Sequence, residues 1–259
     1  MKEGLPCPTI SPWSSETDAG PRAALSVILD SVRLRRGPGL LFDGLSLTLA
    51  EQRVGFIGNN GAGKSSLLRL VCGLLPPDSG SVRVHGLDTQ TDRRRFPGLV
   101  GMMFQNPDDQ IIFPTVLEEL AFSLTALGEE RREARRRAQA FLAVAGLEAW
   151  AARAVGGLSQ GERQRLCIMA LEIAEPRVLL LDEPFSSLDR PNQIAFMRHI
   201  RSSDRQILLS THMLDQVRDF GRVLWLENGS VRADGPGREV CAAYCADCSE
   251  RTSGAEPPS

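Results

Sequence analysis

Residues 53–74, RVGFIGNNGAGKSSLLRLVCGL, decide the fold. The apolar run at 53–57 predicts a short strand, and a glycine-rich turn follows it directly. A helix is predicted over 64–74, where apolar side chains recur at helical spacing: Leu67, Leu68, Val71 and Leu74. A strand that passes through such a turn into a helix is the context in which the pattern G-x-x-x-x-G-K-S/T marks a phosphate site.

The turn at 58–65 satisfies that pattern. Glycines let backbone N–H groups turn inward around phosphate oxygens, and the following helix adds partial positive charge at its N-terminus. Lys64 is expected to reach the β- and γ-phosphates of ATP, and the Ser65 hydroxyl to ligate Mg²⁺. A chance glycine-rich turn is the alternative, but the strand, the helix and the Lys-Ser pair all occur in the order and at the spacing that the pattern requires. The expected nucleotide-binding residues are Gly58, Asn59, Asn60, Gly61, Ala62, Gly63, Lys64, Ser65 and Ser66.

Two carboxylates follow a second apolar run, VLLL at 178–181. An uninterrupted run of this kind is typical of a parallel strand buried on both faces. Asp182 emerges at its C-terminal end, where ligands of open α/β sheets gather, and is expected to hold Mg²⁺. Glu183 is placed to orient or deprotonate the water that attacks the γ-phosphate. The alternative is an ordinary solvated turn.

The order of elements predicts an α/β fold with a mostly parallel sheet. Strands are expected at 25–35, 45–49, 53–57, 81–84, 99–104, 178–181, 206–209 and 223–226. Helices are expected at 64–74, 116–127, 129–145, after Gly161, and before each of the last two strands. We expect a disordered tail at 1–23, one catalytic domain at 24–235 with a helical subdomain inserted at about 107–165, and a partly disordered extension at 236–259.

Composition points to a soluble globular chain that can bury a core. Of 259 residues, 42% are hydrophobic, and the formal net charge of −2 gives no overall field toward nucleic acid or anionic lipid. No apolar stretch approaches the roughly 20 residues of a spanning helix, and the N-terminus has no signal-peptide pattern. A role at a membrane would therefore be peripheral and depend on a partner.

Two local patterns invite other functions. Five arginines at 131–137 would suit nucleic acid, but glutamates among them favour a solvated, ion-paired helix face. Cys241, Cys245 and Cys248 have a spacing compatible with an iron–sulfur cluster or part of a zinc site. A single short helix with Cys241 and Cys245 on one face is the simpler interpretation, and in a cytosolic chain free thiols are expected.

Further motifs lie between the glycine-rich turn at 58–65 and the carboxylates at 182–183, and after them. In chain order they are Gln105, the pentapeptide at 158–162, the tripeptide at 187–189, and His212. The pentapeptide resembles the signature of ATP-binding-cassette (ABC) ATPases, and the resemblance covers roughly residues 25–235. It implies a P-loop NTPase with an N-terminal β-subdomain and an inserted helical subdomain. The residues that carry it are Leu158, Ser159, Gln160, Gly161 and Glu162, with Ser187, Leu188 and Asp189.

The resemblance also implies a mechanism. Two cassettes would pair head to tail, so that Ser159 and Gly161 contact the γ-phosphate bound by the opposite subunit. Gln105 would take part in catalysis, ligate Mg²⁺ and link nucleotide state to a transmembrane partner. His212 would steady the γ-phosphate as a catalytic residue, and Asp189 would couple the two sites across a homodimer or heterodimer.

This chain departs from the family's usual pattern at three places. Gln160 stands where glycine is most usual and Glu162 where glutamine is, which implies an active signature with altered tuning. The tyrosine that commonly stacks on adenine is missing, and Arg36 occupies about its place. A guanidinium can also stack on a base.

The segments 51–64 and 105–118 look like the ATPases of energy-coupling-factor transporters, which import vitamins and metals. The run at 223–235 is most similar to the biotin branch, and the cobalt and nickel branch is next. The expected function is therefore an ATPase peripheral to the cytoplasmic face of the membrane, which powers import through transmembrane subunits. The alternative is a soluble ABC ATPase that acts on nucleic acid, ribosomes or cluster assembly.

Overall fold

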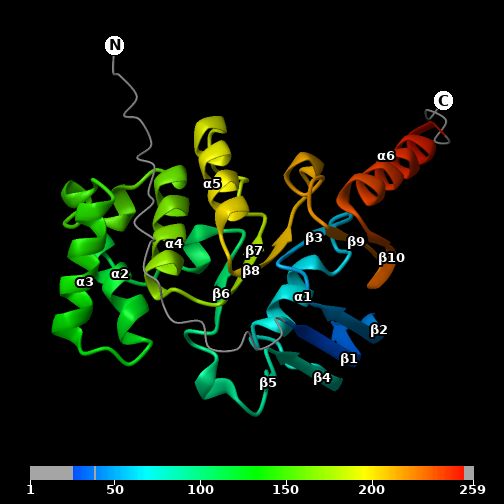
Figure 1. Cartoon of the computed structure of the whole chain (residues 1–259), viewed down its shortest axis with the longest axis horizontal. Helices are drawn as coiled ribbons and strands as arrows, with labels where there is room; N and C mark the ends of the chain where they lie inside the picture. Colours follow the sequence, from blue (N-terminus) through cyan, green and yellow to red (C-terminus); the bar gives the residue numbers. More distant parts are fainter. Residues whose placement is uncertain (1–25, 38, 254–259) are drawn as a thin grey trace. The chain divides into compact units, whose positions relative to one another are not determined.

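The computed structural model describes residues 26–37 and 39–253, which form two compact units (Figure 1). One unit contains residues 97–177 and 184–205, which we call the helical unit. The other contains the described residues up to 96 together with 178–183 and 206–253, which we call the sheet unit. The predicted tail at 1–23, the start of the first predicted strand at Leu25, and residues 254–259 lie outside the described residues.

The sheet unit contains an antiparallel sheet with the strand order β2-β1-β4-β5. Its central strand β1 pairs with β2 on one side and with β4 on the other. Side chains alternate between buried and exposed along β1, with one interruption at Asp30 and Ser31, where the register with β2 shifts. The bounds are β1 Val27–Arg36, β2 Gly39–Leu49, β4 Ser79–Val84 and β5 Leu87–Asp88.

The second sheet of this unit has the order β10-β9-β3-β8-β7. β3 runs parallel to β8 and β9, β7 runs parallel to β8, and β10 is antiparallel to β9. Every residue of β7 and β8 is buried, which fits parallel strands that are covered on both faces. The bounds are β3 Arg53–Ile57, β7 Val178–Asp182, β8 Gln206–Ser210, β9 Arg222–Glu227, β10 Ser230–Gly235, α1 Lys64–Val71, η1 Arg93–Arg95, η5 Leu214–Gln216 and α6 Gly237–Ser253.

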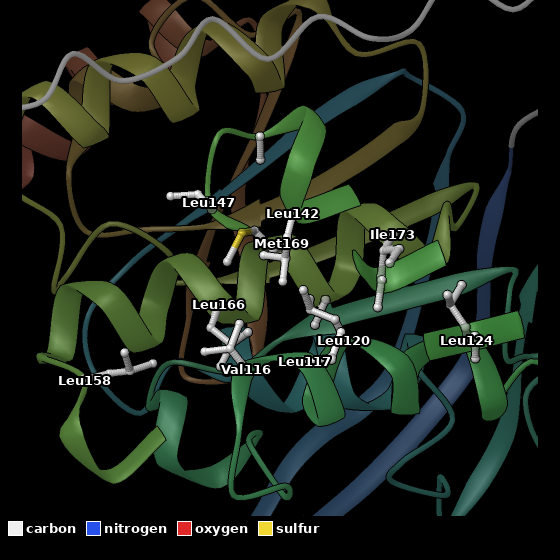
Figure 2. Close-up of a cluster of buried hydrophobic side chains, with 14 residues drawn as sticks. Val116, Leu117, Leu120, Leu124, Leu142, Leu147, Leu158, Leu166, Met169 and Ile173 are labelled. Atoms are coloured by element: carbon white, nitrogen blue, oxygen red, sulfur yellow. The ribbon is translucent and has the colours of Figure 1, made fainter. Parts of the chain in front are cut away.

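The helical unit packs three helices around one apolar cluster, whose largest members Figure 2 labels. Leu120 of α2, Leu142 of α3 and Leu166 of α4 are all fully buried in it. Thr115 caps α2, because its side chain accepts a hydrogen bond from the N–H of Glu118. The bounds are β6 Val100–Met103, η2 Pro107–Asp109, α2 Val116–Thr125, α3 Arg131–Val144, η3 Glu148–Trp150, η4 Val155–Gly157, α4 Gln160–Ala174 and α5 Arg190–Ser202.

The prediction of a helix before the strand at 223–226 is wrong, because a single 3-10 turn, η5, stands there. The Thr211 hydroxyl accepts the N–H of Met213 and donates to Gln216 Oε1, which closes the segment into a tight turn. Strand β10 was not predicted. It follows the turn Asn228-Gly229, where both residues have positive φ, the geometry of a two-residue hairpin.

Two arginines of α3 form ion pairs with nearby glutamates. Glu133 binds Arg136, and Glu129 binds Arg137. The ion-paired helix face expected from the sequence is confirmed for these pairs, although their spacings are three and eight residues.

The cysteine-bearing segment is helical, as the simpler interpretation expects. Cys241 is buried whereas Cys245 is exposed, so one helix carries them in different environments. Within residues 26–37 and 39–253, no group of three or more His, Cys, Asp or Glu side chains is arranged to hold a metal ion. None of the helices in the described part of the chain is both long and apolar enough to cross a bilayer.

Candidate nucleotide site

The glycine turn after β3 is pressed against its neighbours so closely that two positions require glycine. A Cβ on Gly58 would lie 2.1 Å from the carbonyl oxygen of Leu226, and a Cβ on Gly63 would lie 2.9 Å from the ring of Phe42. Both glycines also have positive φ, which L side chains rarely adopt. The turn therefore exposes backbone rather than side chains at the start of α1.

The N-terminus of α1 is available to an anion. Its N-cap is Gly63, which makes no side-chain cap bond, and no acidic residue lies in the first turn of this described helix. The first N–H groups of a helix have no intrahelical partner, and the helix dipole adds positive charge there. This arrangement suits phosphate oxygens.

Lys64 reaches back across the turn. It is only 7% exposed, and its Nζ donates to the carbonyl oxygens of Gly58 at 2.6 Å and Asn59 at 3.2 Å. Burial lowers the pKa of Lys64, while the nearby charges of Glu183 and Asp182 act in the opposite direction. The cation thus lies between the turn and the two carboxylates that the sequence placed in the same site.

Asp182 and Glu183 stand at the C-terminal end of β7, as predicted. Asp182 is 2% exposed, and its Oδ1 accepts a 2.6 Å hydrogen bond from the hydroxyl of Ser210 on β8. The N–H of Glu183 donates to the carbonyl oxygen of the same serine at 3.0 Å. Ser210 therefore fixes both acidic residues, a role the sequence analysis missed although the serine stands two positions before His212.

Glu183 and His212 form a close pair. The Nδ1 of His212 lies 2.7 Å from Glu183 Oε2, which also accepts the His212 backbone N–H at 3.3 Å. The His212 side chain is 64% exposed, whereas Glu183 is buried. Glu183 has φ of 50°, a left-handed conformation that is costly for a residue with a Cβ and that four other described residues outside this site also adopt. The pair places one buried carboxylate beside a solvent-facing imidazole.

Arg36 lies beside the start of α1. Its Nη1 donates to the hydroxyl of Ser66 at 3.5 Å, and its side chain is exposed. Ser65 next to it is half-buried. Arg36, which takes the place of the missing tyrosine, thus contacts α1, the helix that follows the phosphate turn at 58–65. Its contact with adenine stays a prediction.

The remaining predicted residues belong to the helical unit. Gln105 is exposed in the loop after β6. Asp189 caps α5, because its side chain accepts the N–H of Asn192 at 3.0 Å. A Cβ on Gly161 would lie 3.3 Å from the carbonyl oxygen of Ser187, so the pentapeptide and the tripeptide at 187–189 are neighbours within this unit. Leu158 and Leu188 are buried, while Ser159 and Gln160 are exposed.

The unusual Glu162 has a structural explanation. Ser159 and Glu162 form a capping box at the start of α4, in which each side chain accepts the backbone N–H of the other residue. Glu162 Oε1 also accepts a 2.7 Å hydrogen bond from Arg153. The Arg153 hydrogen bond is the largest cause that lowers the pKa of Glu162 to about 2. A charged acceptor therefore stabilises the start of the signature helix.

Glu162→Gln tests that role. Glutamine keeps an acceptor for the N–H of Ser159 but loses the charge facing Arg153, so the variant should be less stable than wild type near pH 7. The folded pKa of Glu162 is depressed below 4.5, so its contribution is complete above about pH 5 and is lost as pH falls toward about 2. Urea unfolding between pH 7 and pH 3 should show the difference between the two proteins shrinking. Glu148→Gln, the same substitution at an exposed position, is the control and should show no such trend. A difference in stability between Glu162→Gln and wild type that does not depend on pH would contradict the assignment.

Comparison with known proteins agrees with this geometry. The family model described as ABC transporter matches residues 42–186. The biotin transport ATP-binding protein BioM of Rhodobacter capsulatus is 44% identical over 85% of this chain and 94% of its own length. The cobalt import ATP-binding protein CbiO of Syntrophus aciditrophicus is 38% identical over 75% of this chain and 71% of its own. A dimeric post-hydrolysis structure of the ATP-binding cassette MJ0796 with ADP and phosphate superposes with a TM-score of 0.72, at 25% identity over 82% of this chain and 99% of that one.

Proposed function

The chain belongs to the ABC transporter family, as an ATPase whose hydrolysis of ATP is coupled to transport, and from that premise we propose that it powers the import of biotin. The observation that carries this proposal is the 44% identity to BioM, which extends over 94% of that relative. Import of a metal ion such as cobalt is the second candidate, supported by the identity to CbiO. Uptake of labelled biotin and of labelled cobalt by cells with and without this chain distinguishes the two: loss of cobalt uptake alone would refute the biotin assignment.

ATP is the substrate of an ABC ATPase, and the sheet unit supplies the residues proposed to bind it. The N–H groups of residues 58–65 would cradle the phosphates, and Lys64 would turn from its carbonyl partners to the β- and γ-phosphates. Exchange of two carbonyl contacts for phosphate oxygens is a small movement for a flexible lysine side chain. Arg36 would lie against the nucleobase.

The donor chemistry of the site fits Mg²⁺. Ser65 offers a hydroxyl and Asp182 a buried carboxylate, both hard oxygen ligands of the kind this ion prefers. These two residues of the sheet unit would hold the ion, which supplies neutralisation of the charge that develops on the phosphates. Gln105, with its amide oxygen, is a further ligand that the family resemblance implies. Ser210 would keep Asp182 oriented toward the ion.

Glu183 is the proposed general base. Its carboxylate would orient the attacking water and accept its proton, and a buried carboxylate can perform this role because little solvent competes for it. His212, paired with Glu183, would hold that carboxylate and present its exposed ring to the γ-phosphate. The buried Asp182–Ser210 contact and the strained backbone of Glu183 support a preorganised arrangement.

A second ABC ATPase subunit, identical or related, is the proposed partner for the signature. Ser159 and Gly161 would contact the γ-phosphate held by that subunit, and Asp189 would couple the two sites. The exposure of Ser159 and Gln160 at the start of α4 supports this, since this end of the helix is accessible to a partner. The similar ATP-binding cassette MJ0796, whose structure is dimeric with ADP and phosphate bound, supports a pair of cassettes.

Transmembrane subunits are the proposed partners for transport, with this chain peripheral at the cytoplasmic face. We propose that they contact the loop after Gln105, where Ile112 is 70% exposed. The structure divides this apolar run. Ile111 packs against the helical core, and the ring of Phe113 contacts that of Phe122, with centroids 4.9 Å apart and planes tilted by 39°. Packing beneath the helices therefore explains Ile111 and Phe113 but not Ile112.

The backbone of the loop that presents Ile112 is hydrogen-bonded to a buried side chain of α2. The buried carboxylate of Glu119 accepts the backbone N–H groups of Ile112 at 2.9 Å and Phe113 at 2.8 Å. Such a charge-assisted pair of bonds fixes the backbone while it leaves the Ile112 side chain outside. A fixed, exposed apolar side chain beside Asp108 and Asp109 suits docking of a short partner helix.

Ile112→Asp is expected to reduce association with the membrane subunits and vitamin or metal uptake, while nucleotide binding by the isolated chain stays near wild type. The side chain is already exposed, so its replacement removes little core packing. Val144→Asp makes the same kind of change at a 63% exposed position on α3 and serves as the control. Membrane association and uptake that survive the change, or a variant that unfolds, would show that Ile112 does not dock a partner.

A further inference from the structure

The C-terminal helix α6 lies against β9 and β10, and β9 pairs with β3, the strand that leads into the glycine turn at 58–65. Val240 and Cys241 are buried at the first turns of the helix. Further along, Arg251 binds Asp247 at 2.7 Å and also binds Glu227 of β9. The helix is therefore anchored to the sheet at both ends.

Between these anchors, Tyr244 reaches the phosphate turn. Its ring stands edge-on to the buried Trp225, with centroids 5.2 Å apart and planes at 88°. Its hydroxyl donates a 2.8 Å hydrogen bond to Oδ1 of Asn59, a residue 185 positions earlier in the chain. The contact with Trp225 restricts the orientation of the phenol ring, and in this orientation the hydroxyl reaches Asn59 of the turn.

Asn59 connects this contact to the nucleotide site. Its carbonyl oxygen accepts from Lys64 Nζ and from the N–H of Ala62, each at 3.2 Å. The carbonyl oxygen of Ala62 in turn accepts the N–H of Gly229 at 3.2 Å. The turn is thus fastened at one end by a side chain from α6 and at the other by the hairpin between β9 and β10.

We propose that Tyr244 is a positioning residue of the nucleotide site, whose hydroxyl fixes the Asn59 side chain and so holds the phosphate turn in the conformation that receives ATP. This rests on the proposed binding of ATP at 58–65. Burial, together with a hydrogen bond to Cys248, raises the pKa of the Tyr244 phenol, so the hydroxyl keeps the proton it donates at physiological pH. The effect falls on affinity rather than on chemistry, because the hydroxyl of Tyr244 bonds to Asn59 of the turn, whereas the proposed base Glu183 is paired with His212.

Tyr244→Phe isolates the hydroxyl, since phenylalanine keeps the ring against Trp225. With the full chain and a fluorescent ATP analogue, the Kd should rise about two- to tenfold, the range for loss of one hydrogen bond. In the complex with its membrane subunits, the KM for ATP should rise by a similar factor with kcat unchanged. A role confined to stability would instead lower the thermal midpoint and leave Kd and KM as they are.

A double-mutant cycle tests whether the effect passes through Asn59. In an Asn59→Ala background, Tyr244→Phe should have no further effect on Kd. Arg251→Gln removes an anchor of the same helix without touching Asn59 and should leave Kd unchanged. An unchanged Kd in Tyr244→Phe, or an effect that persists in the Asn59→Ala background, would overturn the inference. Lys64→Ala, measured alongside, separates this from failure of the site itself: if it binds the analogue like wild type, the nucleotide assignment fails instead.

Discussion

Glu183→Gln is expected to lower ATP turnover by about 10²- to 10⁴-fold, the range for loss of a general base, while ATP still binds. The amide keeps the size of the side chain and can still pair with His212, but it cannot accept a proton from water. Lys64 and the phosphate turn are untouched, so affinity for the ATP analogue should stay close to wild type. Steady-state phosphate release and equilibrium binding measure the two quantities separately.

A matched control exists for this change. Glu175 also has φ of 50° but is exposed at the end of α4, so Glu175→Gln repeats the chemistry and the backbone strain away from the site. It should hydrolyse ATP at the wild-type rate. If Glu183→Gln does the same, the carboxylate is not the base. Resemblance to the family further predicts that the inactive variant accumulates as an ATP-bound dimer, which size-exclusion chromatography with ATP can detect.

Lys64→Ala is expected to weaken ATP binding by roughly tenfold to a hundredfold and to reduce hydrolysis with it. Charge-assisted contacts of a cation with phosphate are worth about 1.5–3 kcal/mol each. The buried environment strengthens this expectation, because burial reduces competition from water. Loss of the cation would also remove the hydrogen bonds to Gly58 and Asn59 that tie the turn together.

Arg69→Ala is the control for Lys64→Ala. Arg69 lies on the same helix, exposed in its last turn, so its removal changes the net charge equally without reaching the turn. Its nucleotide affinity should match wild type. An unchanged affinity in Lys64→Ala, measured by titration of the ATP analogue, would count against the phosphate assignment of the whole turn.

The sequence by itself determined the parts of the site that depend on neighbours in the chain. A strand, a glycine turn and a helix in succession predict where phosphates would bind, since backbone N–H groups need no distant partner to face them. The carboxylates at 182 and 183 were predictable for the same reason, because a buried parallel strand delivers its last residues to one edge of the sheet. The helices at 116–127 and 129–145 followed from their periodicity, and the structure confirms them within a few residues.

Only the tertiary structure decided which of several chemically similar residues is exposed and which side chains contact each other. Ile111 and Ile112 are adjacent and chemically alike, yet Ile111 packs against the core and Ile112 faces solvent, because the buried Glu119 holds the backbone N–H groups of Ile112 and Phe113. The contacts of Asp182 with Ser210, and of Tyr244 with Asn59, join residues far apart in the chain. Local periodicity carries no information about such contacts, because they arise only when sheet and helix pack, and packing sets the direction in which each side chain points.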